Sequence, residues 1–499
     1  MIRLALLTIL AFPILLFGQS NEWTKRLKWS PTYSIAEDFQ LQRVIPSNDG
    51  FYMVRADRQK GSPVFIDTYD KQLNLQHQIG FDPANRGDAW QFERLVRLRD
   101  TFYLFSTELL EKNLKHTLYY ESILSDSINF RLDQQVALET IKMPMRNQSG
   151  DFEVIVDQEE THCLIVTHHP TELNKKVIKT TLLGKGQQTI WEKTIKLPYP
   201  ADHLDIRDKQ IDQAGNLFIL ARHYRKGRVS RRKGVPNYHY VLLQYAPQST
   251  ISTVYTLDAN NQLITDLQFR LLGDGEVVAA GLVSNAKRME TDGTCYFRID
   301  LRQQKVIQQT VSNITAGQNT NMPSAQAVGD TEVPKYITID HLFIRSDGGV
   351  LLIAERSFQV SKYTYQDDDI LLVNLDKDGD PEWATRIPKK QSSYYTEDVR
   401  LSYYPIVVED EVFLVYNDDG RNFTYSKNRK RLQHHKSVKG FSTLTVVRAD
   451  GSWKAFPIAQ NSIENLALNP NACRQIGSKT LLLYAANGKK YRLGKLQLE

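Results

Sequence analysis

Two segments of the chain concentrate positive charge, and a third concentrates tyrosine. The segment 222–238 holds the candidate ligand-binding residues Arg225, Lys226, Arg228, Arg231, Arg232 and Lys233, and the segment 417–440 holds Lys427, Arg429, Lys430 and Arg431. Clustered guanidinium and ammonium groups attract anions such as an acidic glycan, a lipid phosphate or an acidic protein. The segment 392–404 holds the further candidates Tyr394 and Tyr395, whose rings could stack on sugars. The alternative is solvated loops and tyrosines packed between strands.

Other polar motifs have a local explanation. The stretch "DKDGD" (376–380) resembles the start of a calcium loop, but the twelfth place is Ile387, which cannot supply the bidentate carboxylate. We therefore expect an ordinary turn. His162 and Cys163 are adjacent, so in a strand they point to opposite faces. No nucleophile elbow, H-E-x-x-H zinc motif or glycine-rich phosphate loop occurs. We predict no metal and no cofactor, and the catalytic residues, if any, stay unassigned.

The composition favours strands and argues against nucleic acid as a partner. The 499 residues include 24 Tyr, 20 Phe and 6 Trp, types that are enriched in strands. The net charge of +6 is a small excess for this length, and few aromatic residues lie between the positive charges to stack on bases. The three cysteines, Cys163, Cys295 and Cys473, match no metal-ligand spacing, and we expect buried thiols.

The N-terminus reads as a cleaved export signal over residues 1–20. Arg3 precedes an apolar stretch, 4–17, that Pro13 interrupts and that is too short to span a bilayer of about 30 Å. An uncleaved anchor is the alternative. We expect a mature, monomeric protein of residues 21–499 in the periplasm or at the cell surface, with no transmembrane segment.

A repeated pattern of paired apolar runs indicates the architecture. The first runs are "FYMV" (51–54), "FYLF" (102–105), "CLIV" (163–166), "LFIL" (217–220), "VVAA" (277–280), "VLLIA" (350–354), "VFLVY" (412–416) and "LLLYAA" (481–486). Each is followed by a second run, and most follow a shorter segment that ends in a polar turn. Continuous apolar runs imply strands covered on both faces. Four strands in each of eight units predict an all-β, eight-bladed propeller; seven blades are the alternative.

The two ends of the chain complete this scheme. The last unit lacks a fourth strand, and "EWTKRLKW" (22–29) offers one. Its Trp23 and Leu27 have the W-x-x-x-[IL] spacing of "WEKTI" (191–195) and "WATRI" (383–387). We therefore expect residues 22–29 to be the outer strand of the last blade, which closes the ring and removes two free edges.

The stretch "DGGVLLIAERSF" (347–358) with "DDDILLVNLDKDGDPEWATRI" (367–387) resembles a propeller repeat common in exported proteins of gliding and gut-type Gram-negative bacteria. That repeat has an apolar run after "DGG" and then the pattern K-L-D-x-x-G-x-x-x-W. Unit six matches it closely, unit three keeps "GKGQQTIWEKTI", and the other units keep the strand pattern. The resemblance implies the fold and export, and it implies no activity.

The loops predict which face of the ring binds. In a blade, the second-to-third loops and the crossings between blades share one face, and here they are long: 222–238, 284–293, 356–369 and 417–440. Functional residues concentrate on such loops. We expect a binding or scaffold protein that recognises an envelope protein, a surface protein or an anionic glycan with this long-loop face. The alternative is an enzyme acting on extracellular, possibly acidic, polysaccharide, which requires carboxylates that converge at the axial mouth.

Overall fold

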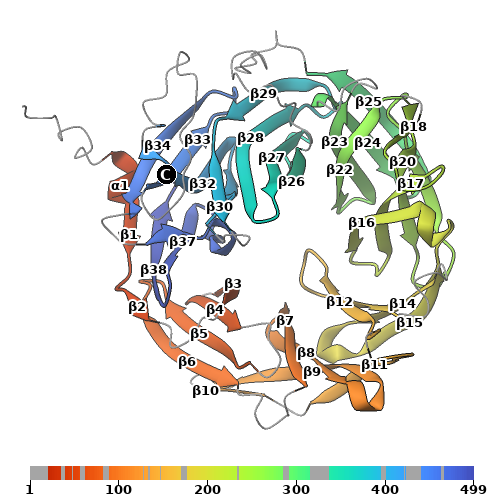
Figure 1. Cartoon of the computed structure of the whole chain (residues 1–499), viewed down its shortest axis with the longest axis horizontal. Helices are drawn as coiled ribbons and strands as arrows, with labels where there is room; N and C mark the ends of the chain where they lie inside the picture. The colour runs from red at the N-terminus through yellow and green to blue at the C-terminus, as the bar shows by residue number, and fades with distance from the viewer. Residues whose placement is uncertain are drawn as a thin grey trace, which may run out of the picture.

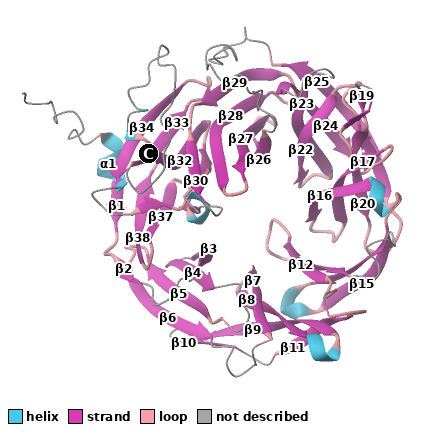
Figure 2. Cartoon of the chain, viewed as in Figure 1, coloured by secondary structure: helices cyan, strands magenta, loops and turns pink. Residues whose placement is uncertain are grey.

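The computed structural model is a closed ring of eight antiparallel sheets, an eight-bladed β-propeller (Figure 1). It describes residues 21–34, 40–47, 49–56, 62–81, 89–126, 129–132, 135–146, 148–169, 177–232, 235–284, 291–314, 337–394, 400–420, 422, 440–461 and 466–498. Strands make up most of the ring, with a few short helical turns (Figure 2). The predicted fold class is confirmed, with eight blades rather than seven. The expected export signal lies outside the described residues.

The first four blades follow one another in chain order. Blade 1 contains β3 (Gln40–Ser47), β4 (Gly50–Ala56), β5 (Val64–Asp70) and β6 (Leu75–Phe81). Blade 2 contains β7 (Trp90–Leu98), β8 (Thr101–Leu110), β9 (Lys115–Asp126) and two short outer strands, β10 (Asn129–Leu132) and β11 (Val136–Lys142). Blade 3 contains β12 (Asp151–Val156), β13 (Cys163–His168), β14 (Val177–Leu183) and β15 (Thr189–Lys196). Blade 4 contains β16 (Leu204–Ile211), β17 (Leu217–Tyr224), β20 (Tyr238–Tyr245) and β21 (Thr253–Leu257), with the small hairpin β18 (Arg231–Arg232) and β19 (Val235–Pro236) between β17 and β20.

The other four blades complete the circle. Blade 5 contains β22 (Leu263–Leu272), β23 (Glu276–Ser284), β24 (Thr291–Asp300) and β25 (Lys305–Asn313). Blade 6 contains β26 (Thr338–Ile344), β27 (Val350–Ser361), β28 (Thr364–Leu375) and β29 (Pro381–Ile387), and β30 (Gln391–Tyr394) also pairs with β28. Blade 7 contains β31 (Tyr403–Val408), β32 (Glu411–Asp418), β33 (Phe441–Val447) and β34 (Trp453–Gln460). Blade 8 contains β35 (Ala467–Leu468), β36 (Arg474–Gly477), β37 (Thr480–Asn487), β38 (Lys490–Gln497), β1 (Leu27–Trp29) and β2 (Tyr33–Ser34).

The continuous apolar runs form the second strand of every blade, as predicted. In β27, Val350 and Leu352 pack in the cluster shared with blade 5. Their neighbours Leu351 and Ile353 pack in the cluster shared with blade 7. Alternate residues of a strand point to opposite faces, and here both faces are covered by another blade. Each such side chain contributes about 1.5–3 kcal/mol when fully buried, so the interfaces between blades form the core of the ring.

The ring is closed by an N-terminal strand. β1 pairs antiparallel with β38 (Lys490–Gln497), with Leu27 opposite Leu496 and Trp29 opposite Gly494. The strand is shorter than expected, because the residues before it form a helical turn, α1 (Glu22–Arg26). The Asn21 side chain accepts hydrogen bonds from the backbone N–H groups of the next turn and so caps this helix. In Figure 1 the start of the described chain lies beside the blade that contains the C-terminus.

The W-x-x-x-[IL] motif has a packing function between blades. Trp383, in the outer strand of blade 6, donates its indole N–H to the carbonyl of Ala449 in a turn of blade 7, at 2.8 Å. Gly451 in that turn has a φ of +79°, and a Cβ there would lie 2.8 Å from the Trp383 ring. In blade 3, Trp191 also lies against a turn of blade 4 that contains Gly215, but without the indole hydrogen bond. In these two blades the motif therefore packs an outer strand against the short turn of the next blade.

Two turn predictions have different outcomes. The stretch "DKDGD" is a tight turn, because Asp376 accepts hydrogen bonds from the backbone N–H groups of Asp378 and Asp380, both at 2.9 Å. In contrast, the expected long loop 356–369 is wrong. β27 and β28 continue through it as a hairpin that turns at Lys362 and Tyr363. The β-branched and aromatic residues of 358–365 favour extended backbone, which explains the longer strands.

Two further expectations concern the cysteines and membrane-spanning segments. All three cysteines are free and buried, as predicted. Across the described part of the chain, no helix has the length and apolar character that crossing a bilayer would require.

Candidate functional site

The first predicted basic cluster lies at the outer side of blade 4, where Figure 1 places β18 near the rim of the ring. Arg225 and Lys226 are exposed in the segment that follows β17. Arg228 has a structural function: its guanidinium donates hydrogen bonds to the carbonyls of Ala201, Asp202 and Leu204, at 2.9–3.2 Å. The backbone of Arg231 and Arg232 forms β18, and Lys233 lies outside the described residues. Binding by this cluster stays a prediction.

The other predicted site residues fall largely where nothing is described. Lys427, Arg429, Lys430, Arg431 and Tyr395 lie outside the described residues. The backbone of Tyr394 ends β30, opposite Thr364 of β28. This places Tyr394 on the blade 6 hairpin, at the long-loop face.

A different set of polar residues gathers near the start of the first strand of a blade, which is the innermost strand and is called the inner strand below. In five blades the inner strand contains a one-residue bulge near its start, and the extra residues are Gln42, Glu93, Arg207, Thr265 and Asp340. A bulge bends the strand and changes the direction of a side chain. The inner strands start at the end where the crossings arrive, which is the long-loop face. The bulges therefore place polar residues at the mouth of the ring on that face.

Among the bulge residues whose side chains are described, Arg207 and Asp340 are exposed. Blade 5 lies between them. Its Asp266 is 4.0 Å from the Arg207 guanidinium and accepts a hydrogen bond of 2.9 Å from the backbone N–H of Ile339. The guanidinium of Arg222 also lies 3.8 Å from Asp266. We call Arg207 and Asp340 the mouth pair: one positive and one acidic side chain, joined through blade 5.

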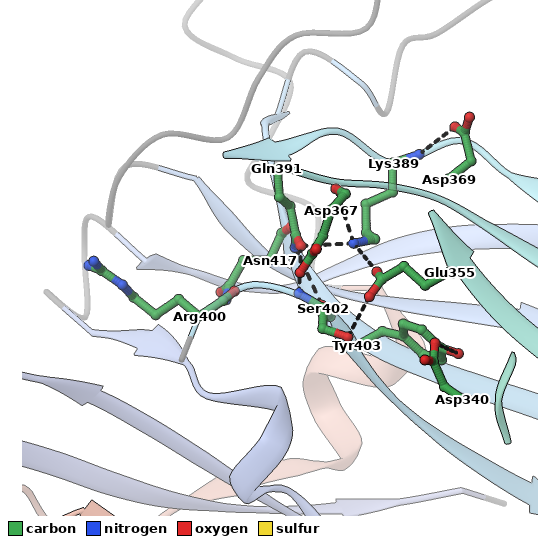
Figure 3. Close-up of polar contacts among 10 residues, drawn as sticks. All are labelled: Asp340, Glu355, Asp367, Asp369, Lys389, Gln391, Arg400, Ser402, Tyr403 and Asn417. Carbon is green, nitrogen blue, oxygen red and sulfur yellow. Dashed lines mark hydrogen bonds and ion pairs between the residues drawn. The ribbon is translucent and has the colours of Figure 1, made fainter. Parts of the chain in front are cut away.

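The Asp340 carboxyl sits beside a second acid. It accepts a hydrogen bond of 2.9 Å from the Tyr403 hydroxyl of blade 7 (Figure 3). Asp340 is exposed, yet its carboxyl is partly desolvated by the protein around it. This partial desolvation, together with the charge of Glu355, raises the pKa of Asp340 to about 7. The carboxyl therefore changes its charge near neutral pH.

Glu355 belongs to a buried network behind the mouth pair. The Lys389 ammonium lies 2.5 Å from one Glu355 oxygen and donates a hydrogen bond of 2.8 Å to the side chain of Gln391. The other Glu355 oxygen accepts from the Ser402 hydroxyl at 2.7 Å. Figure 3 shows these groups turned toward one another beside Tyr403. Lys389 is 1% exposed and Glu355 3% exposed. Burial raises the pKa of Glu355, while Lys389 opposes that rise.

The network continues through Asn417, which is fully buried. Gln391 donates to the backbone carbonyl of Asn417 at 2.8 Å. The Asn417 amide donates to the carbonyls of Arg400 and Leu468, and its oxygen accepts from Asn461 and from the Leu468 backbone N–H. Polar groups from blades 6, 7 and 8 are therefore mutually satisfied, and the network fixes the position of the strand that carries Tyr403.

The acids near the mouth differ in their access to water. Glycosidases use two carboxyl groups that both reach the substrate. Here Asp340 is exposed and Asp367 is half-buried, whereas Glu355 is buried and paired with Lys389 and Ser402. The mouth pair can bind an anionic group at Arg207 and hydroxyl groups at Asp340. Within the described part of the chain, no group of three or more His, Cys, Asp or Glu residues is placed to hold a metal ion.

Sequence reasoning missed the mouth pair and its supporting network. The segment around Asp340, "ITIDHLFI" (337–344), has the pattern of an ordinary strand, because a bulge has no strong sequence signature. A weak signal existed for Lys389: it is a lysine in the short segment that follows the outer-strand motif "WATRI" (383–387). Its burial depends on Glu355 and Ser402, which are far from one another in the sequence.

Comparisons with known proteins give little beyond this geometry. No protein-family model matches the sequence, and no curated protein matches it. Solved structures that resemble parts of the chain include a protein of unknown function from Bacteroides caccae, with 9% identity over 70% of this chain and 99% of that chain and a TM-score of 0.29. A mutant of the Synechocystis apocarotenoid oxygenase has 10% identity over 70% of this chain and 73% of that chain, with a TM-score of 0.34. A mutant puromycin hydrolase has 10% identity over 77% of this chain and 53% of that chain, with a TM-score of 0.36. None of these similarities informs the function.

Proposed function

We propose that this protein is an exported binding propeller that recognises a glycan or protein partner with its long-loop face. The observation that carries the proposal is the mouth pair, Arg207 and Asp340, exposed on the bulges of two inner strands and joined through Asp266. The apolar N-terminal stretch 4–17 supports export. The buried Lys389 network supports a preorganised mouth, because it fixes the strand carrying Tyr403 before any ligand arrives.

An acidic glycan is the partner class that fits both charges of the mouth pair. The Arg207 guanidinium can pair with a sugar carboxylate or sulfate through charge-assisted hydrogen bonds. The Asp340 carboxylate can accept hydrogen bonds from sugar hydroxyls, and Tyr403 holds one of its oxygens in place. The exposed Arg225 and Lys226 of blade 4 add positive charge on the same face, which increases the rate of encounter with an anion.

A retention experiment tests this proposal. The purified mature protein is passed over immobilised acidic and neutral polysaccharides, in parallel with the variant Arg207→Gln/Asp340→Asn. The matched control is Arg99→Gln/Asp100→Asn, which changes an exposed arginine and an exposed aspartate in the β7–β8 turn on the opposite face. We expect wild type and control to be retained by an acidic polysaccharide and the mouth variant to flow through. Equal retention of all three would reject the mouth as the binding surface, and retention of none would reject the glycan partner.

A polysaccharide-cleaving enzyme is the second candidate function, and one observation favours it. The pKa of Asp340 is raised to about 7, and a general acid or base works best near the pH at which it operates. Incubating acidic polysaccharides with wild type and with Asp340→Asn, and assaying reducing ends, distinguishes the two functions. Cleavage by wild type that the variant lacks would favour the enzyme. Intact polysaccharide with both proteins favours binding alone.

A further inference from the structure

Two histidines face each other across neighbouring strands of blade 4. His223 of β17 lies directly opposite His239 of β20 in the strand ladder. Residues opposite each other in an antiparallel pair project to the same face. The Nδ1 atom of His223 is 3.4 Å from the Nε2 atom of His239. The rings are nearly perpendicular, with centroids 5.0 Å apart.

This nitrogen separation matches the one that a shared metal ion requires. Zinc binds imidazole nitrogen at about 2.0–2.1 Å in tetrahedral geometry, so two such nitrogens lie about 3.3–3.4 Å apart. Imidazole is a preferred ligand of zinc, copper and nickel. We propose that His223 and His239 form a two-imidazole chelate for a divalent transition metal of the zinc and copper class. This inference is independent of the proposed function.

The surroundings hold the His223 ring and the ends of the two strands in place. Tyr199 stacks on the His223 ring, with centroids 3.8 Å apart. Beyond the pair, the buried side chain of Asn237 donates hydrogen bonds to the carbonyls of Lys226, Gly227 and Val229. These bonds, with the one from the Arg225 N–H to the Asn237 carbonyl, tie the end of β17 to the start of β20, where the two histidines lie. A chelate held by such contacts loses little side-chain freedom when the metal binds.

Burial favours the neutral form of both imidazoles. Burial lowers the pKa of His223, and the neighbouring His239 and His203 lower it further. Burial also lowers the pKa of His239, which the charge of Asp258 partly offsets and the charge of Arg225 reinforces. Neutral imidazole is the ligand form, since a protonated ring has no free lone pair. Neither histidine is fully buried.

Titration of the metal-free protein with Zn²⁺ and with Cu²⁺ tests the chelate. We expect one ion per chain, and a loss of about tenfold or more in affinity for His223→Gln, His239→Gln and the double variant. His77→Ala is the matched control, because His77 is a single exposed histidine on β6 (Leu75–Phe81). Circular dichroism checks that each variant is folded. With Cu²⁺, electron paramagnetic resonance should show two nitrogen ligands in wild type and one in each single variant.

Two results would overturn the inference. Wild-type affinity equal to that of the double variant would mean that the pair is only a hydrogen bond between two imidazoles. A copper spectrum with a single nitrogen ligand in the wild type would mean that the ion is held by an isolated surface histidine.

Discussion

The Lys389 ammonium lies 2.5 Å from the Glu355 carboxylate, and both side chains are almost completely buried between blades 6 and 7. Removing water from two charges is costly, and only close pairing with further hydrogen bonds offsets that cost. Ser402 and Gln391 supply those bonds. The pair therefore fixes how these two blades meet, directly behind Asp340 and Tyr403.

Breaking this pair on one side should destabilise the ring. Lys389→Met leaves a buried carboxylate without its counter-charge, and we expect a loss of about 3–5 kcal/mol in the free energy of unfolding. The double variant Lys389→Met/Glu355→Gln should recover part of the loss, because no charge is then left unpaired. Urea denaturation measures both. A single variant within about 0.5 kcal/mol of wild type would show that the pair is not structural.

Replacing Asn417 should also destabilise the ring, although this residue carries no charge. Asn417→Ala removes the partners of the Leu468 backbone groups and of the Arg400 carbonyl. Each buried polar group left without a partner costs about 1–3 kcal/mol, so the melting temperature should fall by several degrees. The control is Asn471→Ala at an exposed position, which should leave the melting temperature unchanged. Equal effects of the two variants would contradict the network.

Closure of the ring depends on the N-terminal segment. Trp23 is buried against Phe413, with ring centroids 5.7 Å apart, and against Phe456 at 6.1 Å. We expect Trp23→Ala to lower the free energy of unfolding by about 3–5 kcal/mol, as truncation of a buried tryptophan does. Thermal unfolding followed by calorimetry measures the effect. If the variant has the same melting temperature as wild type, residues 21–29 do not stabilise the ring.

The raised pKa of Asp340 predicts a pH dependence of stability. The folded chain keeps this carboxyl protonated up to about pH 7, whereas the unfolded chain releases the proton near pH 4. Between these values the folded state binds more protons, so this group makes stability fall as the pH rises from about 4 to about 7. Asp340→Asn should remove that part of the dependence. Melting temperatures of both proteins from pH 4 to pH 8 check this, with Asp100→Asn as the control. Parallel curves for wild type and Asp340→Asn would contradict it.

The sequence predicted the ring well for a physical reason. Second strands such as Val350–Ser361 are covered on both faces, so their first residues are continuously apolar and easy to locate. The short turns were also predictable, since Asp376 and Gly379 have the chemistry of a tight turn. The hairpin over 356–369 was missed because its polar residues suggested a loop, whereas its alternating β-branched and aromatic residues extend the strands.

The candidate site was mostly not predictable. The prediction relied on charge density, which led to the 222–238 segment, where Arg228 is used to hold the backbone of 201–204. Arg207 and Asp340 each stand alone in the sequence and are linked only through Asp266 of blade 5, which lies between their blades. His223 and His239 could have been noticed as matched strand positions, but their register depends on a loop whose length does not fix the pairing.

The most direct test of the account measures the affinity of the mouth for one acidic oligosaccharide by calorimetric titration. We predict that Arg207→Gln/Asp340→Asn weakens binding about tenfold or more, because hydrogen bonds to charged groups contribute about 1.5–3 kcal/mol each. Arg99→Gln/Asp100→Asn on the opposite face should bind as wild type does. A mouth variant with wild-type affinity, or an equal loss in the opposite-face variant, would contradict the assignment of the binding face.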